Sequence, residues 1–205
     1  MKSNLIFRQL FDYETWTYTY LLADSQSKEA SLIDTVKEQS ERDLNLLKEL
    51  GLQLKYILDT HIHADHITGA AKLKESTGAK SGVSLAAGAG IADLALEDGQ
   101  EISYGPFKLK VIATPGHTNT CLSFYSEGMV FTGDTLFVRD VGRTDFQEGS
   151  NQKMFESIRE KLFELPSETF VYPGHDYRGH MRSTIHEEQD LNPKVGLKFS
   201  FEEFK

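Results

Sequence analysis

Five of the chain's seven histidines, together with Asp134, lie in turns that follow short apolar segments. The turns begin as Asp59-Thr60-His61, Pro115-Gly116-His117, Gly133-Asp134 and Pro173-Gly174-His175. Neutral imidazole nitrogens and carboxylate oxygens are ligands that zinc and iron accept in proteins. If the apolar segments are neighbouring strands, their ends meet at one rim of a sheet and the side chains converge there. The pattern therefore predicts a metal site.

The first turn continues as the run His61-Ile62-His63-Ala64-Asp65-His66. Residues two apart in an extended chain point to the same side, so we expect His61 and His63 to face one cavity. We expect Asp65 and His66 to lie where the next helix begins and to approach that cavity from another direction.

Each metal-capable residue also has a simpler interpretation. Asp65 would cap the following helix, and Asp134 and His175 would be ordinary turn residues. The lone cysteine, Cys121, lies in the strand after His117, and we interpret it as a small buried apolar residue. The combination of these turns in one chain, and above all the six-residue run, favours the metal site.

The segments that carry the turns predict strands that alternate with helices. Runs rich in β-branched and aromatic residues predict strands over residues 5–11, 15–22, 29–33, 52–58, 100–104, 107–113, 122–126, 129–132 and 169–172. The first three strands predict an antiparallel meander, and the turn residues Gly105-Pro106 and Glu127-Gly128 predict two hairpins. Apolar residues at helical spacing and terminal Gly or Pro predict helices over 35–50, 67–76, 151–165 and 178–188, with a loop over 85–91. Such alternation predicts an α/β fold built in layers.

The bulk composition is that of one globular domain over residues 1–205. Hydrophobic residues make up 39% and charged residues 26%, which is ordinary for a folded protein. The net charge of −9 argues against nucleic acid or an anionic membrane as the main partner. No apolar run reaches the length of a membrane-spanning helix.

Cysteine usage and the first residues bear on location. One cysteine cannot form an internal disulfide, which fits a reducing compartment. The N-terminus enters the strand-like run 5–11 without an apolar signal-peptide segment. We therefore expect a cytoplasmic protein, or one of the mitochondrial matrix if a presequence has been removed.

The order His-x-His-x-Asp-His, Gly-His, Gly-Asp, Gly-His resembles the ligand pattern of the metallo-β-lactamase superfamily. This resemblance implies an αββα sandwich with the site at one edge. Within the superfamily the chain is most similar to the persulfide dioxygenases, also called sulfur dioxygenases. The similarity covers nearly the whole chain, and the run Gly142-Arg143-Thr144-Asp145-Phe146 discriminates best, because glyoxalase II is similar only through Gly-Arg.

The resemblance implies an enzyme that oxidises glutathione persulfide with O2 to sulfite and glutathione, using one non-haem Fe(II) per chain. By motif, the iron ligands correspond to His61, His117 and Asp134. Two imidazoles and one carboxylate leave positions open for O2 and substrate. Persulfide sulfur is a soft ligand that suits iron, and iron can pass electrons to O2, which zinc cannot.

The remaining metal-capable residues leave a second metal open. These residues are His63, Asp65, His66 and His175, and Asp134 could bridge two metals. The assignment of a single iron therefore rests on the resemblance, which gives the other four residues a supporting role.

Substrate contacts are also inferred from the resemblance. Glutathione carries two carboxylates, and arginine suits bidentate carboxylate binding, so Arg143 is the candidate, with Tyr177 as a hydrogen-bonding neighbour. In the alternative interpretation, Arg143 forms an internal salt bridge with Asp145 or Asp140, and Tyr177 is a packed aromatic residue.

Two other functions remain as alternatives. The first is a glyoxalase II-like thioester hydrolase, in which two metals and a bridging hydroxide attack hydroxyacylglutathione. The second is a metal-bearing module without catalysis, such as a sensor of sulfur species.

The terminal run Phe199-Ser200-Phe201-Glu202-Glu203-Phe204 bears on the oligomeric state. Three phenylalanines near a chain end predict a homodimer in which a partner subunit covers them. Packing of these rings on their own domain is the alternative.

Overall fold

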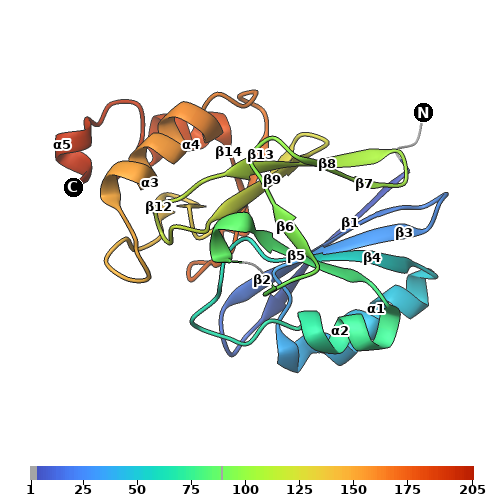
Figure 1. Ribbon diagram of the computed structural model, residues 1–205. Helices are drawn as coiled ribbons and strands as arrows, with labels where there is room; N and C mark the ends of the chain where they lie inside the picture. The colour runs from blue at the N-terminus through green and yellow to red at the C-terminus, as the bar shows by residue number, and fades with distance from the viewer. Residues whose placement is uncertain (1–3, 89) are drawn as a thin grey trace.

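The computed structural model describes residues 4–88 and 90–205 and arranges them in four layers (Figure 1). Two β-sheets face each other at the centre, and helices cover the outer side of each sheet. Apolar clusters fill all three interfaces between the layers. The αββα sandwich expected from the sequence is confirmed.

The first sheet has six strands within the described residues, and they follow one another in chain order. The strands are β1 (Leu5–Asp12), β2 (Thr17–Asp24), β3 (Glu29–Ile33), β4 (Gln53–Leu58), β5 (Lys80–Ser84) and β6 (Leu94–Leu96). β1 to β3 form the predicted antiparallel meander, and β3 to β6 run parallel. The crossover helices α1 (Ser40–Leu50) and α2 (Ala70–Thr77) cover its outer face (Figure 1).

The second sheet also has six strands in the described part of the chain, in the order β14-β13-β10-β9-β8-β7. The strands are β7 (Glu101–Tyr104), β8 (Phe107–Ala113), β9 (Leu122–Ser126), β10 (Met129–Gly133), β13 (Phe170–Pro173) and β14 (Ser183–Thr184). Both predicted hairpins, β7–β8 and β9–β10, are present.

The remaining elements lie around the second sheet. They are the ribbon β11 (Leu136–Phe137) and β12 (Asp140–Val141), and the helices α3 (Asn151–Ser157), α4 (Ile185–Leu191) and α5 (Phe201–Phe204). α3 and α4 pack on the outer side of this sheet through an apolar cluster.

Aromatic packing in the central core reaches the strand ends. Tyr20 of β2 packs against Phe131 and Tyr172 of the second sheet, with ring centroids 4.9 and 5.6 Å away. The buried Tyr20 hydroxyl donates to the Pro173 carbonyl (2.5 Å). This bond fixes the strand end directly before the turn that carries His175.

The predicted helix over residues 178–188 is wrong at its start. Residues 178–184 form a loop and the short strand β14, and α4 begins at Ile185. The Thr184 hydroxyl accepts a hydrogen bond from the Glu187 amide (3.2 Å), and the Glu187 carboxylate accepts one from the Thr184 amide (2.9 Å). This capping box determines where the helix begins. The buried Asp176 carboxylate accepts two backbone amides of the loop, which holds it out of helical form.

Asp65 and His66 do not lie at the start of α2, as the sequence suggested. That helix begins at Ala70, after Gly69 as its N-cap. The Gly69 amide donates to the Thr35 carbonyl (2.9 Å), so the chain is tied to the end of the first sheet before it turns into the helix. The six-residue run is therefore a loop throughout.

Smaller differences concern irregular or short elements. The helix expected from residue 35 opens with a 3₁₀ turn (Lys37–Gln39), and α3 continues as a π-helical turn (Ile158–Leu162). The loop expected over 85–91 opens with another 3₁₀ turn (Leu85–Ala87), and residue 89 lies outside the described residues. β5 and β6 were not expected from the sequence.

Candidate metal centre

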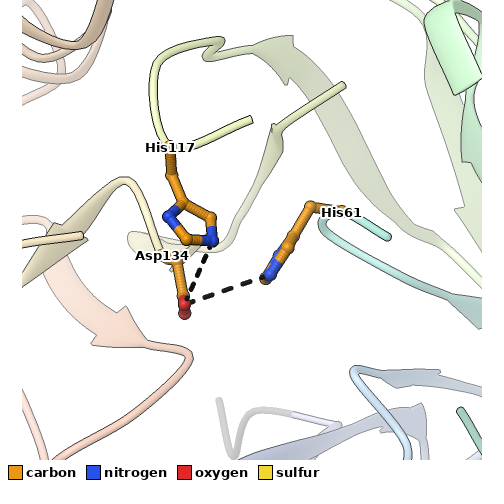
Figure 2. A group of neighbouring side chains, drawn as sticks. All are labelled: His61, His117 and Asp134. Carbon is orange, nitrogen blue, oxygen red and sulfur yellow. Dashed lines mark ion pairs between the residues drawn. The ribbon is translucent and has the colours of Figure 1, made fainter. Parts of the chain in front are cut away.

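Three strand-end turns place His61, His117 and Asp134 around one point (Figure 2). His61 follows β4, His117 follows β8 and Asp134 follows β10. The Nε2 atoms of His61 and His117 lie 4.0 and 3.6 Å from Asp134 Oδ2. One donor atom from each residue lies within 4.8 Å of the others. We call these three residues the triad.

Glycines let the turns approach each other to contact distance. Gly133 has a φ of +49°, and a Cβ at this position would collide with the Thr60 side chain. A Cβ on Gly174 would lie 2.6 Å from Asp134 Oδ1. Gly133 and Gly174 are therefore required by close packing, the first against Thr60 and the second against Asp134.

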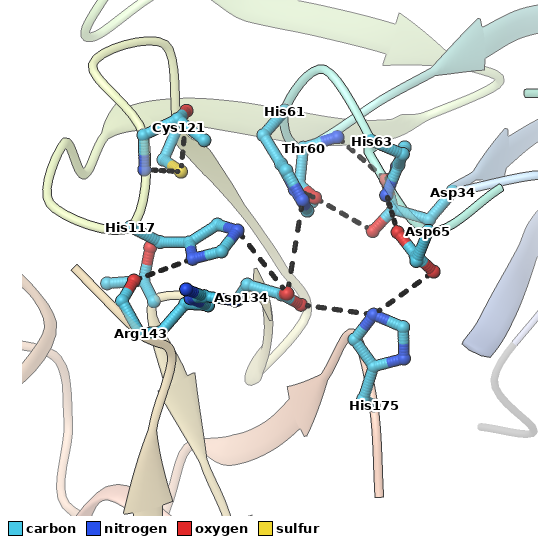
Figure 3. A network of polar contacts seen from close by, with 12 residues as sticks. Asp34, Thr60, His61, His63, Asp65, His117, Cys121, Asp134, Arg143 and His175 are labelled. Carbon is cyan, nitrogen blue, oxygen red and sulfur yellow. Dashed lines mark hydrogen bonds and ion pairs between the residues drawn. The ribbon is translucent and has the colours of Figure 1, made fainter. Parts of the chain in front are cut away.

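The hydrogen bonds of the two triad imidazoles fix their tautomers (Figure 3). Thr60 Oγ1 donates to Asp34 Oδ2 (2.9 Å), so it accepts a hydrogen bond from His61 Nδ1 (3.0 Å). His117 Nδ1 donates to the Arg143 carbonyl (2.8 Å). Each ring thus carries its proton on Nδ1 and presents the lone pair of Nε2 toward Asp134. An oriented, neutral imidazole is the form that binds a metal.

Burial also favours metal binding by the triad. Burial, together with the nearby charge of His63, lowers the pKa of His61 to about 3, so this ring is neutral at physiological pH. Asp134 Oδ1 is buried, and no hydrogen-bond donor among the described residues satisfies it. A buried carboxylate oxygen without a donor is costly unless another partner, such as a cation, binds it.

His63, Asp65 and His66, which we call the neighbouring group, form a second metal-capable set beside the triad. His63 Nε2 donates to Asp34 Oδ1 (3.2 Å), and His66 Nδ1 donates to Asp65 Oδ2 (2.9 Å). Although burial acts in the opposite direction, the hydrogen bond to Asp34 raises the pKa of His63 to about 9. His61 and His63 lie next to each other, with ring centroids 4.2 Å apart, as their spacing predicted, but His63 Nε2 bonds to Asp34 and the ring is not among the donor atoms of the triad.

His175 connects the triad to the neighbouring group. Its Nε2 lies 3.6 Å from Asp134 Oδ1 and 3.6 Å from Asp65 Oδ2. Its Nδ1 donates to the carbonyl of Trp16 (3.0 Å), a residue with a φ of +60°. The four residues left open by the sequence thus all lie close to the triad, but they contact different partners.

Arg143 and Tyr177 line a cavity of about 350 Å³ next to His175. The exposed Arg143 side chain bonds Asp145 through two nitrogens (2.8 and 3.1 Å), which is the internal salt bridge considered as an alternative. Tyr177 stacks on the His175 ring, with centroids 5.9 Å apart and an interplanar angle of 7°. The structure therefore places both residues at the site and leaves their contact with substrate as a prediction.

Cys121 is buried, so its thiol is shielded from solvent. Its Sγ accepts a hydrogen bond from the Thr118 amide (3.3 Å), and burial raises the pKa of the thiol to about 11. The interpretation of Cys121 as a small buried residue is confirmed.

The sequence analysis missed two residues that support the site, Asp34 and Thr60. Asp34 accepts hydrogen bonds from the Thr60 amide (2.7 Å), the Thr60 hydroxyl and His63. A signal was present, because Asp34 directly follows β3, in the same strand-end position that singled out the metal-capable turns.

Comparison with known proteins identifies the family. The profile of the "Metallo-beta-lactamase superfamily" matches residues 17–175. The mitochondrial persulfide dioxygenase ETHE1 of Homo sapiens is 48% identical over 203 residues, which cover 98% of this chain and 79% of the human protein. The chain belongs to the persulfide dioxygenase family. The crystal structure of ETHE1 from Myxococcus xanthus matches it with a TM-score of 0.94 and 49% identity, covering 97% of this chain and 88% of that one.

A hydrolase also resembles this member of the persulfide dioxygenase family. The hydroxyacylglutathione hydrolase of Brucella anthropi is 41% identical over 169 residues, covering 78% of this chain and 61% of the hydrolase. The similarity to the dioxygenases thus extends over more of both proteins.

Within residues 4–88 and 90–205, no helix has the length and apolar character needed to cross a bilayer.

Proposed function

We propose that this persulfide dioxygenase oxidises glutathione persulfide with O2 to sulfite and glutathione, at one Fe(II) per chain held by His61, His117 and Asp134. The observation that carries the proposal is the nearly full-length similarity to persulfide dioxygenases, combined with a triad of oriented donor atoms. Persulfide and O2 are the substrates that the family implies.

The donor set suits a redox-active metal. Two imidazoles held through Nδ1 and one carboxylate whose buried Oδ1 lacks a donor among the described residues match the requirements of non-haem Fe(II). Fe(II) held by these three residues would supply electrons for O2 and would favour a soft ligand such as persulfide sulfur. The orienting bonds from Thr60 and from the Arg143 carbonyl restrict ring rotation, so the site is preorganised.

The substrate is bound by residues of the adjacent cavity. Arg143 is the proposed partner of a glutathione carboxylate, because its guanidinium is exposed there and its salt bridge with Asp145 is open to solvent. Tyr177, stacked on His175, presents its hydroxyl as a further hydrogen-bonding group. Together these residues would hold the thiol part of the substrate while its sulfur end approaches the triad.

A binuclear hydrolase is the competing function. The 3.6 Å distances from His175 to Asp65 and Asp134 favour it, because these residues could hold a second metal bridged by Asp134. Against it, the Asp65 carboxylate already accepts a hydrogen bond from His66, and the similarity to hydroxyacylglutathione hydrolase covers less of both proteins than the similarity to the persulfide dioxygenases.

The test is oxygen consumption by protein purified anaerobically and loaded with Fe(II). We expect glutathione persulfide to cause O2 uptake and sulfite release, and glutathione itself to cause neither, because it lacks the outer sulfur atom. S-lactoylglutathione is assayed beside it. Rapid thioester hydrolysis without O2 uptake would reject the dioxygenase and favour the hydrolase, and no turnover of either substrate would favour the non-catalytic module.

Other properties stay predictions from the sequence. The homodimer is a prediction from the terminal phenylalanines; Phe201 and Phe204 each pack on Phe155 of the same chain, with centroids 5.5 Å apart, which supports packing on their own domain instead. The proposed location is the cytoplasm, or the mitochondrial matrix if a presequence has been removed; the human relative is named as mitochondrial. We also propose that residues 1–205 form one domain, supported by the apolar clusters that join the layers.

A further inference from the structure

The cavity beside His175 has a cluster of charges that the proposed function does not yet use. Asp140 contacts two cations at its lining: Lys194 Nζ lies 2.6 Å from Oδ1, and Arg178 Nη2 lies 3.4 Å from Oδ2. We call Asp140, Arg178 and Lys194 the rim cluster. Its members come from three separate parts of the chain, namely the β12 strand, the loop before β14 and the segment after α4.

Buried polar side chains hold the backbone at each member of the rim cluster. Asn192 is fully buried; its Oδ1 accepts the Lys194 amide (3.0 Å), and its Nδ2 donates to the Asp140 carbonyl (3.2 Å). The buried Asp176 Oδ1 accepts the Arg178 amide (2.9 Å). Asn192 therefore fixes two members of the cluster at once.

The charged ends of the rim cluster remain accessible although its backbone is fixed. Side-chain exposure is 58% for Arg178, 53% for Lys194 and 29% for Asp140. Exposed ion pairs contribute little stability, so a ligand can exchange with them at low cost. The 3.4 Å contact of Arg178 is the looser of the two and leaves guanidinium donors free.

The local charge of this cavity differs from that of the whole protein. The chain carries a net charge of −9, whereas the cavity lining presents the cations Arg143, Arg178 and Lys194. Of the acids in this lining, Asp176 is occupied by backbone amides, which leaves Asp140 as the acid facing the cations. Two cations on either side of one carboxylate match an α-amino acid group, which carries one carboxylate and one ammonium.

We propose that the rim cluster binds the zwitterionic α-amino acid end of the γ-glutamyl group of the substrate. Arg178 and Lys194 bind its carboxylate and Asp140 binds its ammonium, while Arg143, after exchange of its exposed salt bridge with Asp145, is left to the glycine carboxylate. The cavity volume of about 350 Å³ lies within the range of small-ligand sites, roughly 300–1,000 Å³. This inference rests on the proposed function, since it takes glutathione as the thiol carrier.

The first experiment measures binding without turnover. S-methylglutathione, whose sulfur is blocked, is titrated calorimetrically into the metal-loaded protein. We expect the double variant Arg178→Gln, Lys194→Gln to bind it about tenfold more weakly, or worse, because two charged hydrogen-bond donors to its carboxylate are lost. The single variant Lys194→Arg, which keeps the positive charge, should retain most of the affinity. Lys198→Gln is the matched control, since Lys198 lies in the same segment but outside the cavity lining.

A second titration tests the ammonium contact by a thermodynamic cycle. N-acetyl-S-methylglutathione lacks the ammonium charge and should bind wild-type protein about tenfold more weakly than S-methylglutathione. In Asp140→Asn the two ligands should bind with similar affinity, because the carboxylate that distinguishes them is gone. An unchanged dissociation constant in the Arg178, Lys194 double variant, or equal discrimination by Asp140→Asn and wild type, would overturn the proposal.

The two proposals fail in different ways. If wild-type protein consumes O2 with glutathione persulfide, but neither titration responds to the rim cluster, the function stands and the subsite is rejected. If the titrations respond as expected without O2 uptake, the subsite stands and the dioxygenase function is rejected. Failure of wild-type protein to bind S-methylglutathione would overturn the subsite whatever the activity.

Discussion

The triad and the neighbouring group are built from the same two residue types but differ in their hydrogen bonds. In the triad, groups that are not ligands hold Nδ1 of each imidazole, so Nε2 is left for a metal. In the neighbouring group, His63 Nδ1 and His66 Nε2 are left free in the same way, but the Asp65 carboxylate already accepts a hydrogen bond from His66 Nδ1, whereas Asp134 Oδ1 has no donor among the described residues. The comparison teaches that residue type selects candidates for a metal site, whereas the hydrogen bonds of the carboxylate distinguish the two candidates.

The largest effect should come from removing a triad residue. Replacing His61, His117 or Asp134 by Ala removes one of three protein ligands, so we expect iron binding and O2 uptake to be lost together. Elemental analysis and an oxygen electrode measure both, and circular dichroism checks the fold. A variant that keeps stoichiometric iron would show that the triad is not the ligand set.

A smaller effect is expected from the group that orients a triad ring. Thr60→Val removes the acceptor of the His61 Nδ1 proton, and iron affinity should fall roughly 10- to 100-fold. The matched control is Thr169→Val, because the Thr169 hydroxyl is buried and has no hydrogen-bond partner in the described part of the chain. Competition with a coloured Fe(II) chelator gives the affinities. Equal affinities for the two variants would mean that ring orientation does not contribute to iron binding by the triad.

A change of the Arg143 side chain should weaken substrate binding without affecting metal binding. Arg143→Ala should raise the apparent KM for glutathione persulfide by about tenfold, through loss of a charged hydrogen bond. Iron content should not change, because the backbone carbonyl of residue 143, rather than its side chain, accepts the His117 proton. Steady-state O2 uptake measures KM, with the exposed Arg8→Ala as control. Unaltered kinetics would remove Arg143 from the substrate site.

The smallest effect on iron is expected in the neighbouring group. His66→Ala and His63→Ala should both leave iron bound, because these residues are bonded to carboxylates outside the triad. His63→Ala should also destabilise the fold, since the buried Asp34 loses a partner, whereas His66→Ala isolates the effect on metal. Two tightly bound zinc ions per wild-type chain, with activity that follows zinc, would reverse the comparison and favour the hydrolase.

The site was predictable from sequence because its elements are local. A strand followed by a Gly-His or Gly-Asp turn needs only neighbouring residues to form, and the family resemblance assigned His61, His117 and Asp134 before any geometry was known. The bond between His63 and Asp34 could not be predicted, because Asp34 follows another strand and alternation along one strand cannot reveal it. Partner choice across strands depends on the assembled sheet.

Much of the fold, like much of the site, could be predicted from the sequence. The antiparallel meander and both hairpins were found from alternating patterns and turn residues. The start of α4 was not predicted correctly, because Asp176 holds the preceding loop through two backbone amides. Such hydrogen bonds cannot be recognised from the spacing of apolar residues. β6 was not predicted for a different reason. It has only three residues, which is too few to show an alternating pattern, and its parallel pairing with β5 depends on a crossover.

Residue 143 links the two halves of the site, because its carbonyl holds the His117 ring while its side chain faces the cavity. This arrangement constrains how the enzyme can be re-engineered for another thiol. Exchanging the side chain alters recognition and leaves the backbone contact intact. Inserting or deleting a residue in the loop that contains Arg143 would displace this carbonyl and turn the imidazole of His117 away from its partners. Laboratory evolution of new specificity should therefore accept side-chain changes at this position and reject changes in loop length.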